Sequence, residues 1–231
     1  MHDGNDHDHD HDHDHDHGGG PSPTPAHPHR PDVEDLPATD TQRLEAAVRE
    51  LLIEKGVFSG SDLRAMLEAI DSWTPALGAR LVARAWVDPS YKARLLSDAP
   101  SAARELGVDP GPTPLVVLEN TPERHNLVVC TLCSCYPKRV LGSPPDWYKS
   151  RVYRSRAVRE PRAVLAEFGT GLPEGVAVHV HDSTADLRYL VLPMRPSGTE
   201  GMSEERLAAL VTRDSMIGVA LASEPAGWVG S

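Results

Sequence analysis

All three cysteines of this chain lie in one six-residue window, Cys130-Thr131-Leu132-Cys133-Ser134-Cys135. Three thiols this close together cannot all pair with one another as disulfides, and the 231 residues contain no fourth cysteine. The window directly follows a short apolar run at 127–129, which is typical of a strand. A loop that turns back after this strand can direct all three sulfur atoms at one point, so the spacing favours a metal site.

The backbone of this loop can also supply ligands. The amides of Ser134 and Cys135 lie beside the point where the three sulfurs meet. A metal that displaces the amide protons would take three sulfurs and two nitrogens and keep one position open. Such a donor set favours a Lewis-acidic trivalent ion over zinc, which prefers four tetrahedral side-chain ligands.

Three other uses of the window stay open from the residues alone. Structural zinc would need a fourth ligand, for which His125, His179 and His181 are candidates. An iron–sulfur cluster generally needs four cysteines. A redox Cys-x-x-Cys pair is conceivable, but the surrounding sequence lacks a thioredoxin-like pattern. We expect His179 and His181, which alternate with valines, to lie on the polar face of a strand.

Charge and hydropathy exclude several classes of protein. The net charge is −11, but residues 1–40 hold 11 of the 34 acidic residues and one basic residue, so residues 41–231 are close to neutral. The folded part therefore has no basic field for nucleic acid and no polybasic patch for a membrane. No apolar run is long enough for a transmembrane helix and the N-terminus does not resemble a secretory signal, so we expect a reducing, cytoplasmic setting.

The N-terminal tail alternates histidine and aspartate from Asp6 to His17 and then becomes rich in glycine and proline up to Pro37. It has almost no aliphatic residues, so we expect it to be disordered. One interpretation is a store for divalent transition metals, because neutral imidazoles bind them. The other is a solubilising tail or an expression remnant.

The remaining pattern predicts an α+β protein with a helical N-terminal arm and a small mixed α/β domain that carries the cysteine loop. We expect a tail at 1–40, the helical arm at 41–108, the α/β domain at 109–222 and a flexible C-terminal tail at 223–231. Ser59 or Ser61, Thr74-Pro75, Asp88-Pro89 and Ser203 are expected helix starts. Strands are expected at 115–118, 127–129, 176–180 and 187–192, and helices at 144–158 and from Pro161 to Phe168.

The segment from Val129 to Pro137 resembles the metal-claw signature of the nitrile hydratase alpha subunit. Flanking segments extend the resemblance from about Thr41 to Ala222. They are Val116 to Thr121, Val140 to Gly142, Pro144 to Lys149, Arg154 to Arg162, Tyr189 to Pro193 and Thr212 to Val219.

The resemblance implies a defined site. Cys130 would remain a thiolate, Cys133 would be oxidised to a sulfinate and Cys135 to a sulfenate, and the amides of Ser134 and Cys135 would complete the metal claw. Thr131 is typical of the cobalt type, so non-corrin cobalt(III) is the expected metal and iron is the less expected one. The metal would act as a Lewis acid on a nitrile, with a metal-bound hydroxide or the Cys135 sulfenate as the nucleophile.

The same resemblance implies partners. Arginines of a beta subunit would hydrogen-bond the oxidised sulfurs, and a metallochaperone or activator protein would help to load the metal. Nitriles would be hydrated to amides.

Three positions depart from the family pattern. Lys138 and Arg139 replace the usual Trp-Pro, Gly111 stands where a glutamine is usual, and Asp186 stands where a glutamate is usual. The two cations would favour an anionic substrate or would be solvated loop charges. Asp182 and Asp186 would support the metal site or form a turn between strands. Trp147 and Tyr148 would pack at the interface between helices and strands rather than touch substrate.

Two further functions remain as alternatives. Thiocyanate hydrolase has the same claw in its gamma subunit and a basic residue after Tyr-Pro, and it converts thiocyanate to carbonyl sulfide and ammonia. A non-catalytic cobalt carrier, in which the tail and the claw both hold metal, is the alternative of another class.

Overall fold

The computed structural model describes residues 37–225. The His/Asp-rich part of the tail and the last six residues lie outside the described residues. By internal contacts, the chain divides into two compact units between Val57 and Phe58.

The first unit contains helix α1 (Asp40–Glu54). Thr39 caps it, because its hydroxyl accepts from the Gln42 amide while the Gln42 side chain accepts from the Thr39 amide. The apolar residues Leu44, Val48 and Leu51 of this helix are all exposed.

The second unit begins with α2 (Gly60–Ser72), which has the same kind of cap between Ser59 and Asp62. Ser59 is therefore the cap, rather than Ser61. None of the residues of α2 is buried, and its apolar residues Met66, Leu67 and Ile70 are exposed.

Three helices follow: α3 (Pro75–Val87), α4 (Pro89–Ser97) and α5 (Ala99–Glu105). A proline stands in the first turn of each, where its missing N–H leaves no helical hydrogen bond unmade. Asp88 and Asp98 cap α4 and α5. The sequence did not predict α5 as a separate helix. The α3 helix supplies a large part of the core through Gly78, Ala79, Leu81, Val82, Ala83 and Ala85.

Four short strands form two parallel pairs. Strand β1 (Leu115–Glu119) pairs with β4 (Arg188–Leu192), and β2 (Arg124–Val129) pairs with β3 (Ala177–Asp182). An antiparallel bridge between Thr121 and Arg124 turns the chain from β1 into β2, so the two pairs run in opposite directions. The ends of β2 and β3 therefore lie on the side where β1 and β4 begin.

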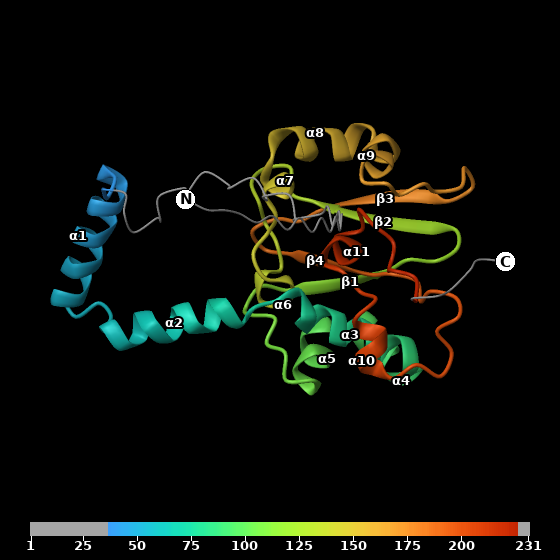
Figure 1. Ribbon diagram of the computed structural model, residues 1–231, viewed down its shortest axis with the longest axis horizontal. Helices are drawn as coiled ribbons and strands as arrows, with labels where there is room; N and C mark the ends of the chain where they lie inside the picture. Colours follow the sequence, from blue (N-terminus) through green and yellow to red (C-terminus); the bar gives the residue numbers. More distant parts are fainter. Residues whose placement is uncertain (1–36, 226–231) are drawn as a thin grey trace, which may run out of the picture. The chain divides into compact units, whose positions relative to one another are not determined.

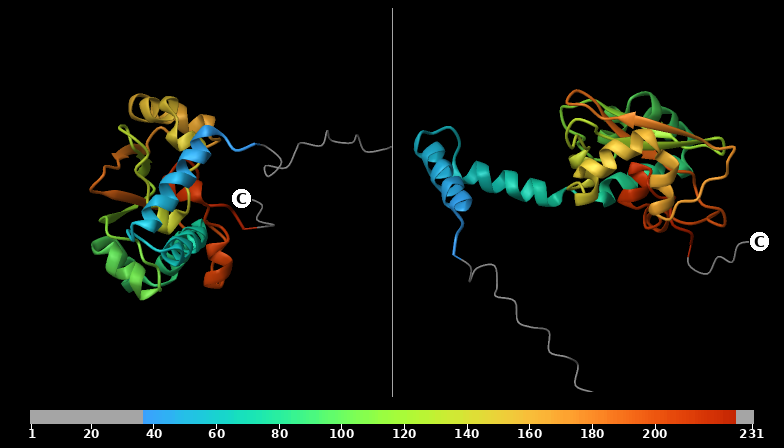
Figure 2. Two further views of the ribbon diagram at one scale, coloured as in Figure 1. Left: turned by 90° about the vertical axis from the view of Figure 1, so that its left-hand side faces the viewer. Right: turned by 90° about the horizontal axis from the view of Figure 1, so that it is seen from above.

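Helices cover the strands from two sides (Figure 1). The α8 (Arg151–Arg159) and α9 (Pro161–Glu167) helices contact β2 and β3, whereas α4 and α5 contact β1. Figure 2, left, shows the same separation, with α8 and α9 above the strands and α4 and α5 below them. The α+β class expected from the sequence is confirmed.

Four further helices complete the fold: α6 (Lys138–Leu141), α7 (Asp146–Lys149), α10 (Glu204–Ala208) and α11 (Arg213–Ile217). The continuous helix expected at 144–158 is wrong. It breaks at Ser150, whose hydroxyl caps α8 by accepting from the Tyr153 amide. Among residues 37–225, no helix combines the length and the apolar character that crossing a bilayer would need.

Helix α11 was not expected. It ends at Gly218 with φ +91°, and a Cβ there would lie 2.0 Å from the Asn126 carbonyl oxygen of β2. Only glycine permits both this backbone conformation and this close approach.

Candidate metal centre

The claw loop, residues 130–135, leaves β2 at a rigid point. The Val128 carbonyl accepts from the Tyr153 hydroxyl at 2.7 Å, and the Val129 carbonyl accepts from the Ser183 amide at 2.7 Å. Both partners come from other elements, α8 and the end of β3. The loop therefore starts from a backbone that two separate parts of the fold hold in place.

The three sulfurs converge as the spacing predicted. The Cys133 Sγ lies 3.4 Å from Cys130 Sγ and 3.2 Å from Cys135 Sγ, and all three lie within 4.8 Å of one another. Cys130 is fully buried, Cys135 is half-buried and Cys133 is exposed, and none forms a disulfide. Three thiols that share one point and leave it open on one side fit a single thiolate-bound ion.

The thiols of Cys133 and Cys135 differ in acidity. Hydrogen bonds from Cys135 and Cys130 lower the pKa of the Cys133 thiol, and the backbone amides of Cys135 and Ser134 add to this effect. Burial raises the pKa of the Cys135 thiol, and its contact with Cys133 raises it further. The backbone amide of Cys133 donates to Cys130 Sγ at 3.2 Å, so the backbone of the claw loop contacts the sulfur cluster directly.

A histidine does not complete the site. The ring of His125 donates to the Gly218 carbonyl at 2.7 Å, at the opposite end of β2 from the claw loop. His181 donates to the Asn126 side chain at 2.9 Å. Among the described residues, the cysteine group contains no imidazole, so the zinc alternative with one of these histidines as fourth ligand is wrong.

Asp182 and Arg154 hold the loop beside Cys130. The Asp182 carboxylate accepts from the amide and from the hydroxyl of Thr131, and Arg154 Nη1 donates to the Thr131 carbonyl at 3.3 Å. Asp182 therefore fixes the position of the claw loop at Thr131. The contact of Arg154 was not expected, because 23 residues separate it from Thr131.

Tyr148 holds the other end of the loop. Its fully buried ring packs edge-on against Tyr136, and its hydroxyl donates to the Cys135 carbonyl at 2.9 Å. Trp147 packs edge-on against Tyr153 and Phe168, at 4.9 and 4.7 Å between ring centroids. Both aromatic residues pack against other aromatic rings, and Tyr148 also makes a hydrogen bond that the sequence did not reveal.

A cavity of about 380 Å³ opens beside the claw loop, and we call it the claw pocket. The loop before β1 and the start of β4 form its other walls, because these strands begin where β2 ends. Besides Cys133, Ser134 and Cys135, its lining includes Trp73, Gly111, Thr113, Lys138, Arg139 and Arg188.

Of the two expected pocket cations, Arg139 is bound within the fold. Its guanidinium pairs with Asp109 and stacks over the Trp73 ring at 5.3 Å from the centroid. Gly111 has φ +89°, and a Cβ there would lie 2.9 Å from Arg139 Cδ, so a glutamine has no room at this position. We call Trp73, Asp109, Gly111 and Arg139 the Arg139 clamp. Lys138 is exposed and forms no ion pair with residues 37–225.

Arg188 is a pocket residue that the sequence did not single out. Its Nη1 donates to the carbonyls of Thr184 and Leu187, and its positive charge opposes the rise in the pKa of the Cys135 thiol. The only signal for Arg188 is its place at the start of β4, which lies beside the claw loop. Asp186 is exposed in the turn before β4, and its backbone amide donates a hydrogen bond to the Thr184 hydroxyl. Its carboxylate contacts no claw residue in the described part of the chain.

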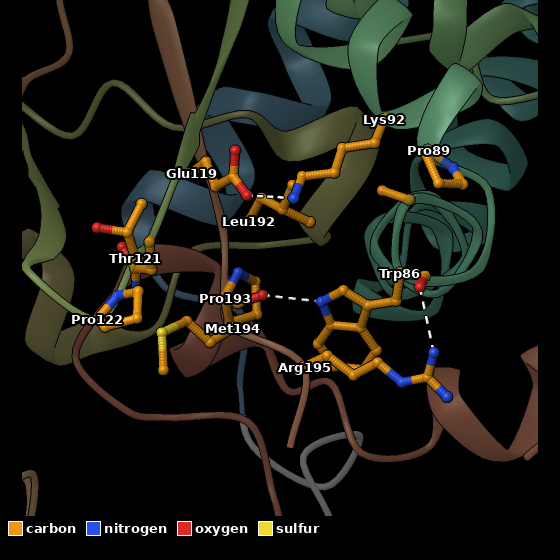
Figure 3. Close-up of a pocket in the computed structure, with 12 residues that line it drawn as sticks. Trp86, Pro89, Lys92, Glu119, Thr121, Pro122, Leu192, Pro193, Met194 and Arg195 are labelled. Carbon is orange, nitrogen blue, oxygen red and sulfur yellow. Dashed lines mark hydrogen bonds and ion pairs between the residues drawn. The ribbon is translucent and has the colours of Figure 1, made fainter. Parts of the chain in front are cut away.

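A second cavity, of about 350 Å³, lies at the other end of the strands (Figure 3). The polar groups that line this cavity form hydrogen bonds and an ion pair with one another or with neighbouring backbone. The Trp86 indole donates to the Pro193 carbonyl at 2.8 Å, Arg195 donates to the Trp86 carbonyl, and Lys92 pairs with Glu119. These bonds join α3 and α4 to the ends of β1 and β4.

Residues 39–220 match the family model described as nitrile hydratase, alpha chain. This chain belongs to the nitrile hydratase alpha-chain family. The match contains the whole claw loop, the Arg139 clamp and Arg188.

Relatives within this family agree with that assignment. The chain is 55% identical over 181 residues to the low-molecular weight cobalt-containing nitrile hydratase subunit alpha of Rhodococcus rhodochrous, covering 78% of this chain and 87% of the relative. It is 48% identical over 203 residues to the thiocyanate hydrolase subunit gamma of Thiobacillus thioparus, covering 83% of each chain. A solved structure of recombinant thiocyanate hydrolase with partially modified cobalt centres superposes with a TM-score of 0.78, at 46% identity over 81% of this chain and 92% of that one.

Proposed function

We propose that this chain is the metal-bearing catalytic subunit of a nitrile hydratase, which hydrates nitriles to amides at a non-corrin cobalt(III) centre. The observation that carries the proposal is the convergence of the Cys130, Cys133 and Cys135 sulfurs within 4.8 Å, in a loop that lies inside the family match. Cobalt-containing relatives support this choice of metal.

The proposed ligands are the three sulfurs and the backbone amides of Ser134 and Cys135. Bound cobalt(III) would supply a Lewis acid that polarises the nitrile. The chain's own groups hold these donors in place: Asp182 and Arg154 fix the loop beside Cys130, and Tyr148 fixes it at Cys135. We further propose that Cys133 is oxidised to a sulfinate and Cys135 to a sulfenate, for which the exposed, acidified Cys133 thiol is well suited.

A beta subunit is part of this proposal. The alpha and gamma subunits to which the chain is similar belong to multi-subunit enzymes. Leu132, at the tip of the claw loop, is 86% exposed, so a beta subunit that covers the loop would bury it. The proposal also carries the expectations of a metallochaperone and of a cytoplasmic setting.

The test uses the complex purified with its beta subunit. We expect one tightly bound cobalt per chain by elemental analysis, and peptide masses with two added oxygens on Cys133 and one on Cys135. The complex should convert aliphatic or aromatic nitriles to amides, and Cys130→Ser should abolish both metal and activity. Turnover of thiocyanate in preference to nitriles would instead assign thiocyanate hydrolysis. Cobalt binding with unmodified thiols and no turnover would assign a carrier.

A further inference from the structure

The claw pocket has an uncompensated positive charge on one side. Three of its lining residues are cationic, Lys138, Arg139 and Arg188, and its described lining contains no carboxylate. Asp109 neutralises Arg139 within the Arg139 clamp. Lys138 and Arg188 form no ion pair with any residue between 37 and 225. Two positive charges therefore remain beside Cys133 to Cys135.

Arg188 is held in a fixed position. Its backbone amide donates to the Pro114 carbonyl at 2.9 Å, and its Nη1 is held by the Thr184 and Leu187 carbonyls. An arginine has five N–H donors in a planar fork. No described residue accepts a hydrogen bond from its Nε or Nη2, so these donors are available to a ligand. A planar, pre-positioned fork of this kind suits a carboxylate.

The pocket has room for more than a nitrile group. Its volume of about 380 Å³ falls within the range of small-molecule sites, which runs from roughly 300 to 1,000 Å³. A nitrile directed at the claw loop would leave space for a substituent several atoms long. Arg188, the first residue of β4, and Lys138, the residue after Pro137, both line this cavity.

We propose that Arg188, together with Lys138, forms an anion-binding side of the claw pocket, and that the enzyme therefore prefers nitriles that carry a carboxylate or another anionic group over neutral nitriles of the same shape. The inference rests on the proposed nitrile hydration and names its substrate class. Arg139 takes no part in this preference, because Asp109 and Trp73 already occupy its guanidinium.

A structural role for the same charges predicts a different result. Thiolates in the claw are negative, and Arg188 could simply offset them. In that case its removal would weaken cobalt binding and would affect charged and neutral substrates equally. An anion-binding role changes one substrate more than the other.

The experiment compares 3-cyanopropanoate with its neutral counterpart 3-cyanopropanamide on the cobalt-loaded complex with the beta subunit. For the unaltered enzyme we expect a higher kcat/KM for the carboxylate, and this ratio should fall as ionic strength rises. In Arg188→Gln, the ratio should fall by about tenfold or more, mainly through KM, the factor expected for one charge-assisted hydrogen bond. Arg188→Lys should restore part of it. Lys138→Gln should lower the ratio by a smaller factor, because lysine binds as a point charge without the planar fork of arginine.

Arg151→Gln is the matched control, since Arg151 is an exposed arginine of α8 outside the pocket lining. It should leave the ratio unchanged. An unaltered ratio in Arg188→Gln, or an equal fall for both substrates with loss of cobalt, would overturn the inference. If neither compound is turned over, the proposed function fails. Calorimetric binding of the two compounds then decides the anion preference by itself, because equal affinities, or affinities insensitive to Arg188→Gln, contradict it.

Discussion

The Asp182 carboxylate accepts two hydrogen bonds from Thr131, at 2.9 Å from the backbone amide and 2.5 Å from the hydroxyl. These residues are 51 positions apart, and the contact ties the end of β3 to the loop directly after Cys130. The direction in which the claw loop leaves β2 thus depends on one carboxylate of another strand.

We expect Asp182→Ala to release cobalt faster than the unaltered protein. Both residues are exposed, so the loss of global stability should be only about 1 kcal/mol. Asp182→Asn keeps one acceptor and should have an intermediate effect. Cobalt release into a chelator measures the rate, and Asp186→Ala, in the same turn but without a claw contact, is the control. Equal release rates in Asp182→Ala and Asp186→Ala would contradict a positioning role.

The Arg139 clamp predicts a specific cost for a side chain at Gly111. Gly111→Ala should destabilise the protein by roughly 1–3 kcal/mol for the left-handed backbone, with a further loss from the contact with Arg139 Cδ. Gly107→Ala is the matched control, because Gly107 has φ +71° but nothing within 4 Å of its Cβ position. Chemical denaturation of both variants, with and without Arg139→Ala, measures the contact. If Arg139→Ala reduces the loss of unfolding free energy in Gly111→Ala no more than it does in Gly107→Ala, Gly111 and Arg139 are not coupled.

Two histidines predict loss of stability in acid. Burial lowers the pKa of His125 and of His181 below the ordinary value of 6.5. The unfolded chain therefore binds protons near pH 6.5 while the folded rings resist them, so the free energy of unfolding falls as the pH drops below 6.5. Denaturation midpoints between pH 7.5 and 5 should show this slope.

Substitutions can assign that slope. His125→Gln should flatten it, although the variant also loses the bond to Gly218 and starts from lower stability. His179→Gln, on the exposed side of β3, is the comparison and should flatten the slope only slightly, because the charge of His179 adds a smaller contribution than burial to the lowered pKa of His181. A slope that is unchanged in His125→Gln and His181→Gln would assign the acid sensitivity to other groups.

The His/Asp-rich segment predicts an effect on metal supply. Deletion of residues 1–37 should leave activity intact when cobalt is plentiful and reduce cobalt loading when it is scarce, because the imidazoles bind divalent cobalt. A tail of equal length with its histidines changed to asparagine separates metal binding from solubility. Equal loading of all three proteins at limiting cobalt would show that the tail has no part in metal supply.

The sequence predicted the convergence of the three cysteine sulfurs because their spacing is local. Cys130, Cys133 and Cys135 lie in one loop, and any tight turn brings them together. Most helix starts were equally readable, since Ser59, Asp88 and Ser203 cap their own helices within three residues. The end of α11 also carried a signal, because Thr212 begins a capping pattern and Gly218 follows five helical residues.

The supports of the site were not predictable in this way. Asp182 and Arg188 reach the claw loop or its pocket because β2 pairs with β3 and β1 with β4, and Arg154 reaches it because α8 packs on β2. Strand pairing and helix packing are both non-local properties. Arg139 is close to the claw loop in sequence, but distant residues determine its contacts. Asp109 and Trp73, which lie 30 and 66 positions away, decide where its charge is used.

Because the two strand pairs run in opposite directions, the cysteine loop and the other walls of the claw pocket come from different segments of the chain. The three cysteines come from the loop after β2, whereas the loop before β1 and the start of β4 form other walls of the claw pocket. Substitutions around Thr113 or Arg188 can therefore alter substrate preference over evolutionary time while the cysteine loop is inherited unchanged. Related enzymes can in this way keep one cysteine loop and differ in substrate specificity.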